Sequence, residues 1–521
     1  MKRIIFALMV ITAGSIPALA KYSGGSGDPN DPYQIANVAD LLTLAADTND
    51  YNQCFILTAD IDLGSSGAFT TAVIASDTDN SNYSFEGVAF TGIFDGAGHK
   101  ITNLTINTNG AGYLGLFGYL NGLEGYGEIK NLGLENVSVT GVGYSYFLGG
   151  LVGYNWGGAI SNCYSTGAVT GGDNSNPLGG LVGYSERGSI NNCFSISDVA
   201  CGEQGSWLGG LAGGTYSGII SNCFSMGAIT GGDSAGCLGG LVGGTGGSII
   251  SNCHSTGAIT GGDGSSGFGG LVGDNCSNIN NCFSTGIVAG GDYSYGLGGL
   301  VGINSVGSIS NCYSTGDITG GYESTALGGL VGDNYGAISN CFSTGTVTGE
   351  DYSYYLGGLV GETYHGIISN CYSTGTVTSG DGSYDLGGLL GYDFLGYVVV
   401  INCYFLDTAG PNNGYGTLLT DEQMKQQNSF IGWDFVWEIA NGPNDIWAIC
   451  EGVSYPKLAW QFIVGDSDND KDVDFVDFAL MGLKWMQTDS TLYCGGMDLT
   501  GDGLVDIADL GVFCNYWIEG L

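Results

Sequence analysis

The chain has 521 residues, of which 99 are Gly and 7 are Pro, and its 50 Asp and Glu against 10 Lys and Arg give a formal net charge of −40. Nucleic acid and anionic membrane surfaces are therefore poor partners, because both need Lys and Arg to neutralise phosphate. Ample Val, Ile, Tyr and Phe between the glycines argue against a disordered chain.

Residues 1–20 predict a secretory signal. Two basic residues, an apolar run over Ile4–Ile16 and the small-residue site Ala18-Leu19-Ala20 are typical of a cleaved leader. An uncleaved membrane anchor is the alternative. No later stretch holds 18 continuous apolar residues, so we expect no membrane span and a secreted protein, extracellular or at the cell surface.

Residues 21–89 predict an N-terminal cap region, with helical spacing over Val38–Ala46 and strand-like alternation over Phe55–Leu63. From Phe90 onward, short alternating apolar runs broken by Gly or Asn are typical of stacked coils. We therefore place the body of the protein over residues 90–404.

Most of that body is one unit, read from Leu148 as LGGLVGYNWGGAISNCYSTGAVTGG, that recurs about nine times. Its clearest marker is a cysteine, which returns at steps of 29 to 32 residues: Cys163, Cys193, Cys223, Cys253, Cys282, Cys312, Cys341, Cys371 and Cys403. A fixed period of this size indicates a repeat architecture. Each unit offers three short strands and Gly-rich corners, which predicts a mainly β fold, a parallel β-solenoid (β-helix) of about twelve coils.

The hexapeptide LGGLVG at Leu178–Gly183, Leu238–Gly243 and Leu356–Gly361 resembles the GLUG repeat, named for its Gly-Leu-x-Gly core. The resemblance extends over about half of the chain and recurs in register. It implies a β-solenoid module of secreted and surface-attached bacterial proteins, and it brings no catalytic residues with it.

Burial of both Ile160 and Cys163 requires a corner between them, and Asn162 is the candidate because Asn tolerates the left-handed conformation. That register places the thiols inside and turns the next residue of each repeat outward: Tyr164, Phe194, Phe224, His254, Phe283, Tyr313, Phe342, Tyr372 and Tyr404. Such rings either stack on sugars or pack against neighbouring side chains. The opposite register would bury the rings and expose nine thiols, a liability in an exported protein.

An acidic residue follows the third strand of most repeats: Asp173, Glu203, Asp233, Asp263, Asp292, Glu323, Asp351 and Asp381. Like charges at the spacing of neighbouring coils repel one another. We therefore expect this edge to collect divalent cations. Solvated turn residues without an ion are the alternative.

Thiols in neighbouring coils lie too far apart for disulfide geometry and lack metal-ligand spacing, so we expect them to be small apolar fillers. Cys494 and Cys514 bracket one loop and could pair with each other. Five further cysteines have no pairing that the sequence decides: Cys54, Cys201, Cys237, Cys276 and Cys450.

Residues 405–463 break the period and are rich in aromatic side chains, including Trp433, Phe435, Trp437 and Trp447. They predict a C-terminal cap or linker, because an uncovered last coil is a sheet edge that invites polymerisation. A binding patch is the alternative.

Residues 464–521 hold two twelve-residue acidic loops, each followed by an apolar helical pattern, over Phe475–Met486 and Ile507–Ile518. Alternate oxygen ligands, with a carbonyl at the seventh position, suit calcium, which takes six to eight oxygens. The candidate ligands are Asp466, Asp468, Asp470, Asp472, Asp474 and Asp477 in the first loop, and Asp498, Thr500, Asp502, Leu504, Asp506 and Asp509 in the second.

Two such loops, each with a helix after it, resemble a type I dockerin. The resemblance implies Ca²⁺ as the cofactor and a cohesin-like protein as the partner. The positions at which that family reads its partner are Phe475, Val476, Ile507 and Ala508 here, apolar where Ser and Thr are common. Lys471 stands where the first loop would have glycine.

Together these features predict a secreted, non-catalytic adhesion or carbohydrate-associated scaffold, tethered through the calcium-binding domain. The alternative is a polysaccharide hydrolase or lyase that acts on the solenoid surface within a polysaccharide catabolic assembly. A lyase needs a strong base beside calcium, and the nine repeats offer only Arg187. A hydrolase needs two carboxylates about 5–9 Å apart, and Asp95 in FDGAGH, the acid most out of pattern, is interpreted as a turn residue.

Overall fold

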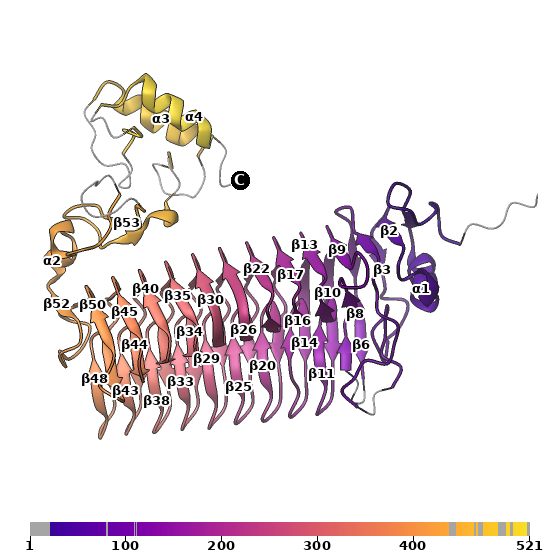
Figure 1. Cartoon of the computed structure of the whole chain (residues 1–521), viewed down its shortest axis with the longest axis horizontal. Coiled ribbons are helices and arrows are strands. Elements are labelled where there is room, and N and C mark those ends of the chain that lie inside the picture. Colours follow the sequence, from indigo (N-terminus) through magenta and orange to yellow (C-terminus); the bar gives the residue numbers. More distant parts are fainter. Residues whose placement is uncertain are drawn as a thin grey trace, which may run out of the picture.

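The chain forms a parallel β-solenoid in a computed structural model that describes residues 21–79, 82–108, 110, 112–436, 444–462, 465–466, 473–487, 496–500 and 504–517. The signal predicted over residues 1–20 lies outside these ranges. Figure 1 shows the turns stacked side by side along the long axis of a rod. The predicted mainly β, parallel β-solenoid is confirmed, because every strand of a turn pairs in parallel with its equivalents in the neighbouring turns.

One turn consists of five short strands that lie in three sheets. In the turn that begins at Leu178 they are β15 (Leu178–Gly179), β16 (Val182–Glu186), β17 (Ser189–Asn191), β18 (Phe194–Ser195) and β19 (Asp198–Ala200). The strand β15 belongs to the first sheet, β16 and β17 to the second, and β18 and β19 to the third.

The first sheet has ten strands, one from each complete turn, so the solenoid has ten complete turns where the sequence predicted about twelve coils. Its strands are β7 (Gly112–Leu114), β11 (Tyr146–Gly149), β15, β20 (Ser206–Gly209), β25 (Gly236–Gly239), β29 (Ser266–Gly269), β33 (Tyr295–Gly298), β38 (Thr325–Gly328), β43 (Tyr354–Gly357) and β48 (Tyr384–Gly387). The second sheet runs beside it through β8 (Phe117–Asn121), β12 (Val152–Trp156), β16, β21 (Ala212–Tyr216), β26 (Val242–Ser251), β30 (Val272–Asn280), β34 (Val301–Asn304), β39 (Val331–Asn334), β44 (Val360–Thr363) and β49 (Leu390–Asp393).

The third sheet carries the strand that begins just after each cysteine. These strands are β14 (Tyr164–Thr170), β18, β23 (Phe224–Ser225), β27 (His254–Ser255), β31 (Phe283–Ser284), β36 (Tyr313–Ser314), β41 (Phe342–Ser343), β46 (Tyr372–Ser373) and β51 (Tyr404–Leu406). Each pairs with the next in register. Residues at the same place in successive repeats therefore form continuous columns along the rod.

The ladder starts before residue 90, where the sequence places the first coil. Strands β1 (Tyr33–Ile35) and β2 (Cys54–Leu57) pair in parallel, and β2 continues to β4 (Ile93–Asp95). The predicted helix is confirmed as α1 (Val38–Ala46), which buries Leu41 and Leu44 at the N-terminal end of the rod. The strand predicted over Phe55–Leu63 is two strands, β2 and β3 (Ile61–Asp62), which lie in different sheets.

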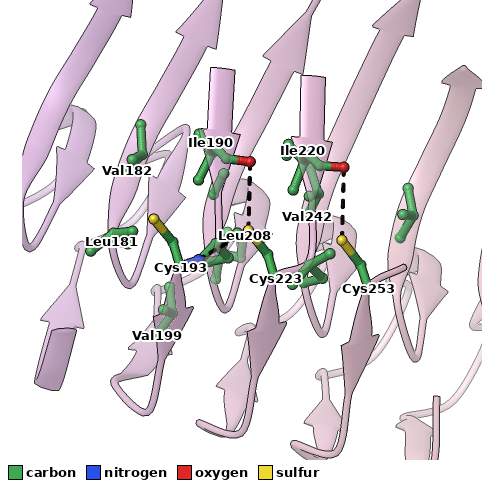
Figure 2. Packing of buried hydrophobic residues seen from close by; sticks show 14 of the residues in the cluster. Leu181, Val182, Ile190, Cys193, Val199, Leu208, Ile220, Cys223, Val242 and Cys253 are labelled. Carbon is green, nitrogen blue, oxygen red and sulfur yellow. Dashed lines mark hydrogen bonds between the residues drawn. The ribbon is translucent and has the colours of Figure 1, made fainter. Parts of the chain in front are cut away.

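The nine repeat cysteines point into the core, as predicted, and are at most 2% exposed. Figure 2 shows Cys193, Cys223 and Cys253 among the leucines and valines of neighbouring turns. The thiol of Cys223 donates to the carbonyl of Ile190 at 3.6 Å, and this hydrogen bond joins two neighbouring turns. Burial of this kind keeps free thiols away from oxidants.

The corner predicted at asparagine is also confirmed. The nine corner residues from Asn162 to Asn402 have φ between 50° and 54°. Most amides donate to the corner amide of the preceding turn, as Asn252 Nδ2 does to Asn222 Oδ1 at 3.3 Å. The side-chain amides of Asn222 and Asn311 instead donate to Asn191 and Asn280, which lie one residue before the corner asparagine of the preceding turn.

After the last turn the chain crosses its end and then folds along its flank. Phe405 fills the space beside Gly388, and the amide of Gly388 donates to the carbonyl of Pro411 at 2.9 Å. The remaining elements are β52 (Thr417–Leu419), α2 (Asp421–Met424), β53 (Trp447–Ala448), β54 (Lys457–Leu458), α3 (Phe475–Lys484) and α4 (Ile507–Tyr516). The helices α3 and α4 share a small core around Met481 and Phe513. Within the described ranges no helix is long and apolar enough to cross a bilayer.

Candidate functional site

The outward aromatic column exists, but its rings stack on one another. From Tyr164 to Tyr372, neighbouring ring centroids lie 4.7 to 5.1 Å apart with planes within 10°. Because each ring face is covered by the next ring, only ring edges reach solvent, and a sugar has no face to stack on. The packing alternative therefore describes this column, and the sugar-stacking expectation for it is wrong.

The C-terminal segment covers part of this column. Phe342, Tyr372 and Tyr404 are at most 5% exposed beneath an aromatic cluster that includes Trp433 and Trp447. The hydroxyl of Tyr372 donates to the carbonyl of Pro456 at 2.6 Å. These contacts place the segment on the flank of the last turns.

Open ring surfaces lie instead on the outer side of the second sheet, at its N-terminal half. Tyr119, Tyr154 and Tyr184 occupy equivalent places on β8, β12 and β16. The angle between neighbouring ring planes increases from 19° for Tyr119 and Tyr154 to 37° for Tyr154 and Tyr184. Trp207 from β20 extends the row, 6.1 Å from Tyr184.

A loop over residues 82–89 closes one side of this row. Phe85 packs 4.5 Å from Tyr119, and the hydroxyl of Tyr113 donates to the carbonyl of Tyr83 at 2.8 Å. Two pockets of about 650 and 480 Å³ result, and both are lined by Tyr83, Phe147 and Tyr154. We call the joined pockets the aromatic groove, lined by Tyr83, Phe85, Tyr113, Tyr119, Tyr144, Tyr146, Phe147, Tyr154, Tyr184 and Trp207. Their volumes are those of ordinary ligand sites.

Two glycines make room for Trp207. A Cβ at Gly214 or Gly244 would lie 2.7 or 3.1 Å from the indole ring, so the ring lies over the bare backbone of β21 and β26. The other side of the ring remains accessible, and Trp207 is 37% exposed. The sequence carries a signal of the groove, because Tyr154 and Tyr184 stand where the next two repeats have Gly214 and Gly244. Column-by-column comparison of the repeats would have found it.

The groove offers hydroxyls but no unpaired base. The hydroxyl of Tyr154 donates to Glu186 Oε2 at 2.7 Å, and burial raises the pKa of Tyr119 and of Tyr184 to about 12, so both phenols stay protonated. Between Tyr22 and Met424 the sequence has three basic residues. Each has a carboxylate within 3.9 Å: Lys100 with Glu135, Lys130 with Glu128, and Arg187 with Glu186.

The acidic column along the turn edge makes hydrogen bonds between turns. Asp263 Oδ1 accepts from the amide of Asp292 at 3.0 Å, and Asp292 Oδ1 accepts from the amide of Tyr322 at 2.9 Å. Tyr322 therefore occupies the acidic position in its turn, and Glu323 follows it in the left-handed conformation with φ of 52°. Asp173, Asp233 and Asp351 make the same bond to the next turn. Cation binding at this edge stays a prediction.

Two acids that depart from the repeat are buried side by side on the second sheet. Asp333 and Glu362 are register partners on β39 and β44, and they are 1% and 2% exposed. Asp333 Oδ2 accepts from the hydroxyl of Tyr295, while Asp333 Oδ1 has no hydrogen-bond partner among the described residues. Burial, with the neighbouring charge, raises the pKa of Asp333 to about 6 and that of Glu362 to about 7. Asp95 instead accepts from the amide of Ala97 at 2.8 Å, as a turn residue does.

The two predicted calcium loops lie partly outside the described residues, which leave out Asp468, Asp470, Asp472 and Asp502. The described parts of the two loops have the same arrangement at the start of the helix that follows each one. Asp474 and Asp506 cap α3 and α4, and their amides donate to Asp477 Oδ2 at 2.9 Å and to Asp509 Oδ2 at 2.7 Å. In the second loop Asp509 Oδ1 also accepts from the amide of Thr500 at 2.8 Å.

The fully buried carboxylates, Asp477 and Asp509, supply oxygen ligands of the kind that calcium takes. Asp498 is 3% exposed, and Asp466 and Leu504 are half-buried at the described edges of the loops. Within the described residues no three His, Cys, Asp or Glu side chains converge as a metal site. The described residues include only part of each loop, so calcium binding stays a prediction.

The cysteines outside the repeat are mostly free. Cys514 is free and exposed, so the predicted pairing of Cys494 with Cys514 is wrong; Cys494 itself lies outside the described residues. Cys450 is disulfide-bonded. The other four are free: Cys54, Cys201, Cys237 and Cys276.

Comparison with known proteins identifies the repeat. Five segments match the family model described as the GLUG motif, residues 145–170, 234–260, 293–319, 323–348 and 352–378. The chain is 36% identical over 160 residues to halomucin of Haloquadratum walsbyi, a match that takes in 29% of this chain and 2% of halomucin. A crystal structure of a candidate immunoglobulin A1 protease from Bacteroides ovatus aligns with 85% of this chain and 96% of its own, at 19% identity and a TM-score of 0.30, too low to carry an argument.

Proposed function

We propose that this GLUG-repeat chain is an exported, non-catalytic scaffold of a cell surface or extracellular assembly. Its rod associates with carbohydrate, and its C-terminal residues dock a cohesin-like protein in the presence of Ca²⁺. The regular columns of the solenoid support a structural role, because ten turns with equivalent residues in register make a stiff body that displays surface. The leader-like residues 1–20 support export.

The observation that carries the tether is the equivalence of α3 and α4. Both begin at an Asp that caps the helix, and in both the Asp three positions later is fully buried and accepts the amide of that capping residue. Carboxylate oxygens at these places are ligands of the kind that calcium takes, and of the loop residues only Lys471 is basic. At the partner-reading positions, Phe475 is 75% and Ile507 is 70% exposed, and exposed apolar residues of this size are typical of a binding surface.

Calcium titration of the whole mature chain by calorimetry tests the tether. We expect two ions bound in the C-terminal loops, distinct from any ions along the acidic turn edge. Asp477→Asn and Asp509→Asn should each weaken one of the two at least tenfold, since each removes a buried charge. The matched control is Glu422→Gln, an exposed acid outside the loops. Equal calcium binding by all four proteins would contradict the proposal.

Docking is tested on the same chain with purified type I cohesins. Phe475→Ala and Ile507→Ala should weaken binding at least tenfold while calcium binding remains, because both side chains are exposed and the buried carboxylates of Asp477 and Asp509 stay in place. Binding that ignores both substitutions, or that persists in chelator, would contradict a cohesin-like partner.

The alternative, a polysaccharide hydrolase, would need a carboxylate pair that a substrate reaches. The pair that departs from the repeat, Asp333 and Glu362, is 1% and 2% exposed, which closes it to a polysaccharide. No specific observation therefore favours this alternative over the scaffold.

A further inference from the structure

We infer that the aromatic groove binds an uncharged polysaccharide chain and rejects polyanionic ones. The inference rests on the carbohydrate association proposed above and assigns it to one place on the rod. Three properties of the groove carry it: its length, its open ring surfaces and the sign of its charge.

The groove is elongated. Its floor tyrosines come from three successive turns, β8, β12 and β16, and Trp207 extends the row from β20. Neighbouring turns are about 4.8 Å apart, so four of them span roughly 15 Å between the first and the last ring. Two pockets that share three lining residues make this length continuous. A site of this length fits several linked sugars better than one.

The groove presents both kinds of surface that a sugar offers. Tyr83, Tyr144 and Trp207 are 68%, 66% and 37% exposed, and their rings offer apolar surface to the C–H faces of a pyranose. Between these rings, Asn174 and Asn176 line the second pocket with side-chain amides. Amides and protonated phenols donate and accept hydrogen bonds without net charge. This combination differs from the stacked aromatic column, whose rings show only their edges.

The charge of the groove sets its selectivity. Glu124 lines the first pocket and Glu186 the second, and Asp77 and Glu86 lie near enough to help raise the pKa of Tyr113 and Tyr146 beyond the effect of burial. The nearest base, Arg187, already faces Glu186 at 3.9 Å. A glycan that carries carboxylate or sulfate would meet like charge in a partly desolvated site and find no free cation.

Affinity electrophoresis and calorimetry on the mature chain without added calcium, which would gel alginate and polygalacturonate, test the inference. The neutral probes are xylan, mannan, cellulose and starch, and the anionic probes are alginate, polygalacturonate and heparin. We expect retention by at least one neutral polymer and by none of the anionic ones. Trp207→Ala and Tyr154→Ala should each weaken binding to that polymer at least about tenfold, as central aromatic residues of a binding site do.

The matched control is Tyr352→Ala, an exposed tyrosine on the acidic turn edge that is 52% exposed and outside the groove. Thermal melts of all variants confirm that they fold. Retention by anionic polymers, or by no polymer at all, overturns the inference. If a neutral polymer still binds both groove variants, the groove is not the binding site, while the proposed carbohydrate association remains intact. A failed calcium or cohesin test bears only on the tether.

Discussion

Asp333 and Glu362 face each other across one step of the ladder, on β39 and β44, and neither forms an ion pair with a Lys, Arg or His that the structure describes. The groups around them are Asp274, which also has a raised pKa, and the phenols of Tyr295, Tyr335, Tyr355 and Tyr364. None of these groups supplies a positive charge. The pair therefore holds protons that an exposed pair would release.

This pair predicts a pH-dependent stability. In the unfolded chain both carboxyls ionise near pH 4, whereas burial raises the pKa of Glu362 to about 7 in the folded protein. From about pH 4 to pH 7 the unfolded chain binds fewer protons than the folded one, so stability falls as pH rises and then levels off. Glu362→Gln should stabilise the protein at pH 8 by about 2 kcal/mol and leave it nearly unchanged at pH 4.

Urea unfolding at pH 4, 6 and 8 measures this effect. Glu350→Gln, an exposed acid in the turn that follows β42 (Val347–Gly349), gives the background from the net charge of the chain. A Glu362→Gln profile parallel to the wild-type profile would show that the pair does not retain its protons.

Buried serines predict a contrast between two turns. The hydroxyl of Ser255 has no hydrogen-bond partner among the described residues, whereas that of Ser373 donates to the carbonyl of Gly388 at 2.6 Å. Ser255→Ala should change the free energy of unfolding by less than about 0.5 kcal/mol, and Ser373→Ala should cost about 1 kcal/mol. Equal losses in urea melts would mean that the Ser255 hydroxyl is satisfied after all.

The asparagine corner predicts a strict residue preference. Asn252 has φ of 53° and its amide donates to Asn222. Asn252→Val should cost about 2–3 kcal/mol, because a β-branched residue is strained there. Asn252→Gly should cost clearly less, since glycine adopts this conformation freely. Similar thermal shifts for the two variants would rule out backbone strain as the reason for asparagine.

A substitution on the acidic turn edge distinguishes cation binding there from simple solvation of the acidic side chains. Asp263→Asn removes one charge, while its side-chain oxygen can still accept from the amide of Asp292. If the column collects divalent cations, chelator lowers the solenoid melting temperature of the wild type and shifts that of Asp263→Asn less. Calorimetric scans with and without Ca²⁺ measure both shifts. If chelator does not move the wild-type solenoid transition, the column binds no cation and the alternative of solvated turn residues holds.

Thiol reactivity predicts which cysteines a reagent reaches. Fourteen described cysteines are free, and Cys514 is the exposed one among them. At pH 8 a disulfide reagent should modify Cys514 within minutes, and burial, which raises the pKa of Cys201 to about 11, should slow the reaction at that site. Cys514→Ser removes the fast phase. A fast phase that includes any of the nine repeat cysteines, identified by peptide mass spectrometry, would contradict the inward register.

Much of the fold followed from local rules. A spacing of 29 to 32 residues indicated the turn, and the three-residue step from Ile160 to Cys163 required a left-handed corner. The thiols were predicted inside because nine exposed free thiols are a liability in an exported protein. Each inference needed only one repeat and its neighbours. The early start of the ladder at Tyr33 was missed because β1 and β2 carry no copy of the repeat.

The sequence by itself determined the period and the asparagine corner, because both recur in every repeat. It favoured the inward thiols, but the structure decided between the two registers. Only the tertiary structure decided what the exceptions do. Tyr154 and Trp207 become a groove because a bare glycine backbone in the following turns lets the indole lie flat. Asp333 and Glu362 become a buried pair because two departures from the repeat, 29 residues apart in the chain, meet at the spacing of neighbouring strands.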